Sequence, residues 1–308
     1  MKLLFDLDTV KSTEFGIGVD KGNVREFAYV AVDFGVQSAL QDMARKTWAE
    51  MQAETNAPPL YEPSEKHGSI EYVYFPLADE LSTYLRTLHQ ADNLVPNSSA
   101  LSEPANVFCY FARLTDAEGL RLTAVRRAAQ FKGVLKSRLL RLTTDALTII
   151  EDKVFKLDSD FDLLIDSENI HILRPSGFEF IGQLQAAVLN AVQQNIEIIQ
   201  ANIDYVDFSG IAAYATKHPR AARYLASICG QEESNNINKR ALKKLCKNTG
   251  VEIKETNGMI VVDEHHVMGF LEVLDRRRYE IELVKDVPER YRAPSRQKLS
   301  SNSSGNDA

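Results

Sequence analysis

Two groups of lysine and arginine side chains are the residues of this sequence best suited to chemistry. The segment from Leu120 to Thr144 contains no acid and seven cations: Arg121, Arg126, Arg127, Lys132, Lys136, Arg138 and Arg141. Ammonium and guanidinium groups neutralise phosphates, and each contact with a duplex releases counterions without reading the bases. This density of cations therefore indicates binding to a polyanion, with double-stranded DNA as the leading candidate.

The second group follows one face of a predicted helix from Asn236 to Thr249. At about 100° per residue, its cations span roughly 140° of the helix; they are Lys239, Arg240, Lys243, Lys244 and Lys247. Leu242 and Cys246 take the opposite side, so that one face packs on protein and the other is cationic. A tight hairpin predicted around Asn257-Gly258 comes next, and this order is similar to the recognition helix and wing of winged-helix proteins.

Both groups of cations are also compatible with roles that involve no nucleic acid. A charged helical face is often simply a solvated face. A basic face can also meet an acidic protein or an anionic membrane surface. For the first group, the acidic segment that follows offers an answer within the chain, because four aspartates could face the basic strand across a sheet: Asp158, Asp160, Asp162 and Asp166.

Three further patterns suggest metal chemistry, and each is incomplete. Glu252 and Lys254 form the E-x-K half of a PD-(D/E)xK nuclease, but the only near candidate for the required partner aspartate, Asp263, lies on the wrong side in chain order. The run of aspartates from Asp158 to Asn169 lacks the glycine and the final glutamate of a calcium loop. The pair of histidines in 263–267 has no third ligand at a suitable spacing. With no phosphate-binding glycine loop or nucleophile motif either, we expect no cofactor and no metal, and keep the nuclease as an alternative.

Composition places the chain among cytosolic globular proteins. It has 308 residues, 44% of them hydrophobic, and three scattered cysteines, which argues against a disulfide framework. No apolar run approaches the roughly 20 residues that span a bilayer. The net charge of −7 hides a segregation: residues 120–144 carry +7 and residues 216–308 carry +4, whereas the rest of the chain is acidic. Segregated basic zones allow an acidic protein to bind nucleic acid.

The pattern of apolar residues predicts an α+β fold. Alternating runs from Asn106 to Arg174 predict an antiparallel β-meander, and a helical region with the hairpin at 251–263 follows it. Ser176 and Glu179 predict a capping box that opens one long helix. A proline-rich loop near residue 104 predicts a boundary between a mixed N-terminal region, 1–104, and the core, 105–285; the polar residues 286–308 predict a disordered tail.

The stretch from Phe131 to Ile181 resembles the core of the KwaB-like proteins of the Kiwa anti-phage defence system. The likeness rests on the pattern V-x-K-L-D-x-D-F-D-L-L-I, on a short strand ending in I-L and on Phe178, which opens the long helix; it covers roughly residues 105–285. The resemblance implies a DNA-binding effector of the bacterial cytoplasm, which acts on phage DNA without catalysis. It also implies a partner, a small membrane protein of the same system (KwaA-like) that recruits it to the inner membrane.

The resemblance supplies no catalytic residue, and the predicted contacts come from the cations alone. We expect non-sequence-specific binding of duplex DNA through two zones, Arg126, Arg127, Lys132, Lys136, Arg138 and Arg141 in the first and Lys239, Arg240, Lys243, Lys244 and Lys247 in the second. A homodimer is expected as well, because doubling a moderate patch raises avidity.

Overall fold

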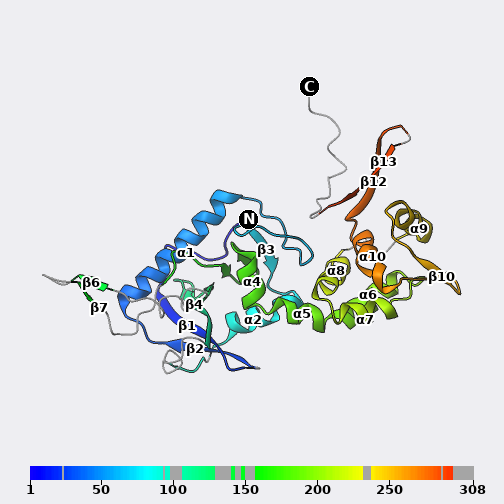
Figure 1. Ribbon diagram of the computed structural model, residues 1–308. Coiled ribbons are helices and arrows are strands. Elements are labelled where there is room, and N and C mark those ends of the chain that lie inside the picture. The colour runs from blue at the N-terminus through cyan, green and yellow to red at the C-terminus, as the bar shows by residue number, and fades with distance from the viewer. Residues whose placement is uncertain are drawn as a thin grey trace. The chain divides into compact units, whose positions relative to one another are not determined.

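The structure is a computed structural model in which the chain forms two compact units (Figure 1). The first unit comprises Met1–Tyr61 and His67–Leu184, and the second comprises Glu62–Lys66 and Gln185–Ala308. The structure describes residues 1–22, 24–92, 94–97, 106–128, 157–231, 237–285 and 287–293, together with the backbone of 140–142 and 147–149.

A seven-stranded antiparallel sheet forms the centre of the first unit. Its strand order is β2-β1-β4-β5-β8-β9-β3. The strands are β1 (Ser12–Asp20), β2 (Arg25–Val30), β3 (Val73–Pro76), β4 (Val107–Thr115), β5 (Arg121–Arg127), β8 (Leu163–Ile165) and β9 (Asn169–Ile172). β4, β5, β8 and β9 are neighbours in the sheet in chain order, which confirms the predicted meander. The short strands β6 (Leu140–Leu142) and β7 (Leu147–Ile149) form a separate hairpin.

Helices cover both faces of this sheet because its strands are apolar on both sides. The long helix α1 (Phe34–Glu54) buries Leu40, Met43 and Met51 against one face. The short helices α2 (Thr83–Gln90) and α4 (Pro175–Ile181) contact β5. Strands β1 and β4 approach each other closely at Gly16. A Cβ on Gly16 would lie 2.1 Å from the ring of Phe111 on the neighbouring strand, so only glycine fits there.

The division of the chain differs from the predicted boundary near residue 104. β1 pairs with β4 from Ser12↔Thr115 to Val19↔Val107, so the N-terminal strands belong to the same sheet as the meander. The units instead divide between Leu184 and Gln185. Composition marked the loop near 104 but carries no information about which strands pair across it, because pairing partners lie about 100 residues apart in the sequence.

The second unit is a helical bundle with two hairpins. Its helices are α5 (Leu184–Asn190), α6 (Val192–Asn202), α7 (Ser209–Ala215), α8 (Pro219–Cys229), α9 (Lys239–Asn248) and α10 (Val267–Leu274), the last preceded by the 3-10 turn η5 (Glu264–His266). α8 packs on α6, α7 and α10 through buried Ala221, Leu225 and Ile228. The hairpins are β10 (Lys254–Thr256) with β11 (Met259–Val261), and β12 (Arg278–Val284) with β13 (Val287–Arg292).

The local predictions are confirmed at the hairpin turn and differ from the structure at the helices and at the predicted tail. Asn257 and Gly258 both have positive φ, 51° and 81°, which confirms the tight hairpin turn. The capping box is wrong: Pro175 begins α4, no side chain caps it, and Glu179 instead accepts a hydrogen bond from Tyr61. The predicted long helix is broken into α4, α5 and α6. Residues 287–292 of the predicted tail form β13, because they pair with β12.

Candidate nucleic-acid interface

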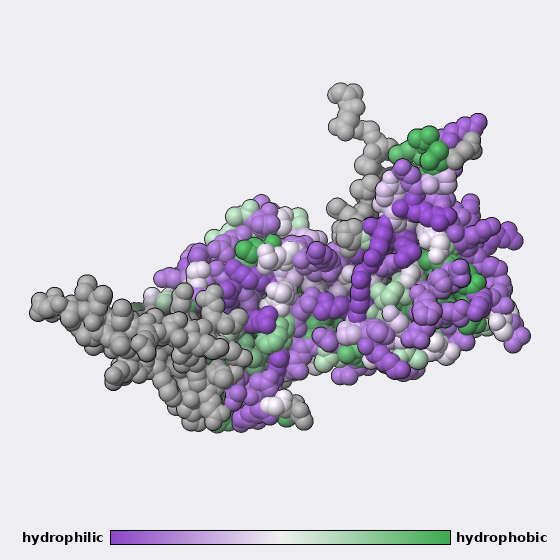
Figure 2. All heavy atoms as spheres, in the orientation of Figure 1, coloured by the Kyte–Doolittle hydropathy of each residue, from purple (hydrophilic) through white to green (hydrophobic). Residues whose placement is uncertain are grey.

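Helix α9 presents the second group of cations as the sequence predicts. Asn238 begins the helix, since its side chain accepts hydrogen bonds from the amides of Arg240 and Ala241. Leu242 and Cys246 are buried on the inner side of the helix. The cations occupy the other side, and Figure 2 shows a mainly hydrophilic surface in this region. Alternation at helical spacing therefore separates an apolar packing face from a cationic face.

An acid on the neighbouring hairpin neutralises part of this face. Glu255 of β10 accepts from Lys239 Nζ at 2.7 Å and from Lys243 Nζ at 2.5 Å. These two hydrogen bonds lower the pKa of Glu255 to about 2, so the carboxylate stays charged at neutral pH. Sequence reasoning missed Glu255, because no local pattern shows that the hairpin folds back beside the helix.

The three remaining cations of α9 differ from Lys239 and Lys243 in their surroundings. Arg240, Lys244 and Lys247 are exposed, and no acid in the described part of the chain forms an ion pair with them. A depression of about 820 Å³ lies beside Lys244 and Lys247, between the helix and the hairpin. Its lining includes Lys243, Lys244, Lys247, Lys254, Glu252 and Asp263. Its rim is therefore mainly basic.

Arg126, from the first group, lies in a different environment from the one that DNA contact requires. Its guanidinium is within 3.4 Å of Asp158, 2.9 Å of Asp160 and 2.7 Å of Asp162, and its side chain is only 14% exposed. Burial lowers the pKa of Arg126, but the three carboxylates outweigh burial and raise it above its ordinary value. The geometry thus favours the alternative in which the chain's own acids neutralise this cation, and we leave Arg126 out of the contact surface.

The rest of the first group is only partly described. Arg127 is exposed and its guanidinium lies 4.0 Å from the centre of the Phe180 ring, while Arg121 pairs with Asp92 at 2.9 Å. Arg141 lies in strand β6, which is described for its backbone. Lys132, Lys136 and Arg138 lie outside the described residues. Their contacts with DNA stay predictions.

The residues of the nuclease alternative are close together but arranged differently from that site. Lys254 Nζ contacts Asp263 Oδ2 at 2.7 Å, so the lysine pairs with the acid that a metal would need. Glu252 is directed to His266, at 3.6 Å. Within the described ranges, no three His, Cys, Asp or Glu side chains are placed to hold one metal ion. Three aspartates of the incomplete calcium loop, Asp158, Asp160 and Asp162, contact Arg126, and Asp160 also lies 2.7 Å from Arg174 Nη1.

A second acid that sequence reasoning missed is Glu272, the only charged residue of the apolar helix α10. It is 2% exposed and contacts three arginines: Arg220, Arg278 and Arg292. A lone acid within a buried helix is a usable sequence signal, because a buried carboxylate requires partners.

Among the helices that the structure describes, none has both the length and the apolar composition that a membrane span requires.

The comparisons with known proteins agree with the resemblance found in the sequence. No curated protein and no solved structure matches the chain significantly. A family model described as "Kiwa protein KwaB-like" matches residues 105–283, which is more than half of the chain and covers β4 to β12. The chain therefore belongs to the KwaB-like family and is a component of Kiwa anti-phage defence.

Proposed function

We propose that this protein binds double-stranded DNA, largely without sequence specificity, through the outer face of α9. The observation that carries the proposal is the set of three exposed cations on one helix, Arg240, Lys244 and Lys247, which pair with no acid that the structure describes. They lie at positions i, i+4 and i+7, so they follow one side of the helix over two turns. Side chains in such a row can contact successive phosphates of a duplex.

The positions of the acids favour the outer face of α9, rather than the first group of cations, as the main DNA contact. The whole chain carries a net charge of −7, so a polyanion meets overall repulsion and can approach only where cations are concentrated. On α9, Glu255 forms ion pairs with two lysines, whereas the other three cations have no acid partner within the described residues. Arg126, by contrast, contacts three acids. We therefore place the main contact on α9, with Arg127 and the cations of 132–141 as a second zone.

We propose a homodimer, in which two α9 faces bind one duplex and gain avidity. We also propose that a small membrane protein of the same defence system is the partner, as the family implies. The end of the β12–β13 hairpin supports a protein contact, because it exposes Leu283, Val284 and Val287 and forms a hydrophobic patch (Figure 2). Leu283→Asp should then reduce co-purification with that membrane protein without changing DNA binding.

Duplex binding measured across a salt series with EDTA present tests the proposal. The triple variant Arg240→Gln/Lys244→Gln/Lys247→Gln should lower the slope of log affinity against log salt by about 2.7, because each phosphate contact contributes about 0.9. Over a fourfold change in salt this corresponds to about a 40-fold smaller loss of affinity. EDTA makes the result independent of divalent ions.

A matched control carries the same change of charge elsewhere. Three cations at the surface of the first unit already pair with acids, namely Lys21 with Glu26, Arg45 with Asp42 and Lys46 with Glu50. Neutralising Lys21, Arg45 and Lys46 should change the slope far less than the α9 variant does. Equal effects of both variants would refute a localised contact on α9. Cleavage of the duplex in Mg²⁺ that Glu252→Gln abolishes would favour the nuclease alternative.

A further inference from the structure

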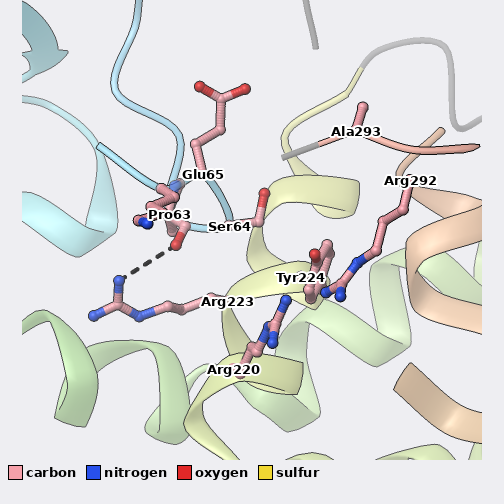
Figure 3. A pocket seen from close by; sticks show the side chains of 9 residues that line it. Pro63, Ser64, Glu65, Arg220, Arg223, Tyr224, Arg292 and Ala293 are labelled. Atoms are coloured by element: carbon pink, nitrogen blue, oxygen red, sulfur yellow. Dashed lines mark hydrogen bonds between the residues drawn. The ribbon is translucent and has the colours of Figure 1, made fainter. Parts of the chain in front are cut away.

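A second basic depression, of about 640 Å³, lies within the second unit and is separate from the α9 face (Figure 3). Three segments form its walls: the loop 62–66, helix α8 and the end of β13. The lining residues are Pro63, Ser64, Glu65, Lys66, Arg220, Arg223, Tyr224, Arg292 and Ala293. We call it the arginine cavity. It contains four cations and one acid.

Two arginines of this cavity, Arg220 and Arg292, share one acid with Arg278, which does not line the cavity. The acid is Glu272, whose carboxylate lies 2.7 Å from Arg278, 2.5 Å from Arg292 and 3.9 Å from Arg220. One carboxylate thus faces three guanidinium groups. The side chains of Arg220 and Arg292 remain 64% and 49% exposed, and Figure 3 shows their guanidinium groups close to each other beside Tyr224. Like charges so placed repel, and one shared carboxylate offsets only part of the charge of three guanidinium groups.

A buried network holds the cavity walls in position. Arg277 is fully buried and donates to Asp275 at 2.5 Å and to Ser64 Oγ at 2.7 Å. It also lies 3.6 Å from Glu65, so the single acid of the lining is directed to this arginine. These bonds fasten the loop 62–66 to the end of α10. A site fixed in advance loses little entropy when a ligand binds.

Helix α8 adds to the positive potential. It has 11 residues, and its N-cap residue His218 makes no capping hydrogen bond with its side chain. The second helical residue is Arg220, so the positive end of the helix dipole lies at the cavity wall. Arg223, one turn further on, donates to the carbonyl of Pro63 across the cavity (Figure 3).

We propose that the arginine cavity binds a small ligand with adjacent phosphoryl groups, such as a nucleoside triphosphate. Guanidinium groups bind phosphate oxygens in bidentate fashion, and two of them side by side match neighbouring phosphoryl groups. The volume is in the range of small-molecule sites. Arg220 and Arg292 are the direct ligands, with Lys66 and the first turn of α8 contributing charge. This site goes beyond the proposed DNA contact, because it shares no residue with α9.

Isothermal titration calorimetry on the full chain tests the proposal, with sodium tripolyphosphate, ATP and citrate as probes. Tripolyphosphate should bind with one site per chain, and Arg220→Gln/Arg292→Gln should weaken it at least tenfold. ATP binding tighter than tripolyphosphate would show that a base contributes, whereas equal affinities would assign the site to the phosphates alone. Citrate binding as tightly as tripolyphosphate would overturn the phosphoryl assignment.

Two controls separate this site from the DNA surface and from misfolding. Lys244→Gln/Lys247→Gln should leave tripolyphosphate binding unchanged; if this variant abolishes it and the arginine variant does not, the proposal fails. The single variant Arg220→Gln keeps Arg278 and Arg292 on Glu272, and it should weaken binding with an unchanged thermal unfolding midpoint. No binding of tripolyphosphate to the folded wild-type chain would refute the arginine cavity while leaving the DNA proposal intact.

Discussion

Glu255 limits the number of lysines that α9 can offer to DNA, and its removal gives a quantitative prediction. The carboxylate contacts Lys239 and Lys243, and Lys239 also donates to the carbonyl of Gly258. Glu255→Gln keeps the size of the side chain and removes the charge. Because the hydrogen bonds of these two lysines lower the pKa of Glu255 to about 2, the acid masks them at every pH used for DNA binding.

The magnitude follows from counterion release. Lys239 keeps its bond to Gly258 in the variant, whereas Lys243 loses the acid that holds it, so Lys243 becomes available first and Lys239 can follow. One additional phosphate contact steepens the slope of log affinity against log salt by about 0.9, and two contacts by about 1.8. Between about 50 and about 200 mM salt, the variant should therefore lose about 3.5-fold to about 12-fold more affinity than the wild type.

Fluorescence anisotropy with a labelled duplex across this salt range measures the effect. Glu252→Gln is the matched control, because Glu252 is exposed and lies near the same depression but contacts His266 rather than a lysine. The control removes the same charge and should shift affinity without a comparable change in slope. An unchanged slope for Glu255→Gln, or the same slope change in both variants, would refute the role assigned to Glu255.

Three further predictions concern the first unit. Arg126→Met should destabilise it by about 3–5 kcal/mol, because the change removes the cation that contacts three aspartates and leaves Arg174 alone beside Asp160 and Asp162; a loss of DNA affinity with unchanged urea unfolding would contradict this. Burial raises the pKa of Asp166, but hydrogen bonds from His171 and three backbone amides outweigh it and hold the pKa below its ordinary value. The resulting stability is present above pH ~4 and is lost as pH falls through the lowered folded pKa. The urea midpoint of Asp166→Asn should therefore depend less on pH in this range than the midpoint of the wild type does. Gly16→Ala should cost about 1–3 kcal/mol in thermal unfolding, since its Cβ would meet the Phe111 ring; an unchanged midpoint would show that the ring can move away.

Local patterns were sufficient to predict much of the fold and the cationic face of α9. Leu242 and Cys246 recur at helical spacing between cations, so the helix and its two faces follow from the chain within a few turns. Asn257-Gly258 requires positive φ at both residues, so the hairpin turn is equally local. The meander was predictable because strands adjacent in the chain are neighbours in the sheet.

The pairing of distant charges, by contrast, was decided by the tertiary structure. Arg126 and Lys244 look alike in the sequence, as cations beside apolar residues, yet one contacts three aspartates and the other contacts none that the structure describes. Glu255 meets its lysines only because the β10–β11 hairpin lies beside α9. Glu272 meets its arginines only because α8 and β13 lie beside α10. Charge acts through distance in space, and a periodic pattern specifies which face a residue occupies but not what that face meets.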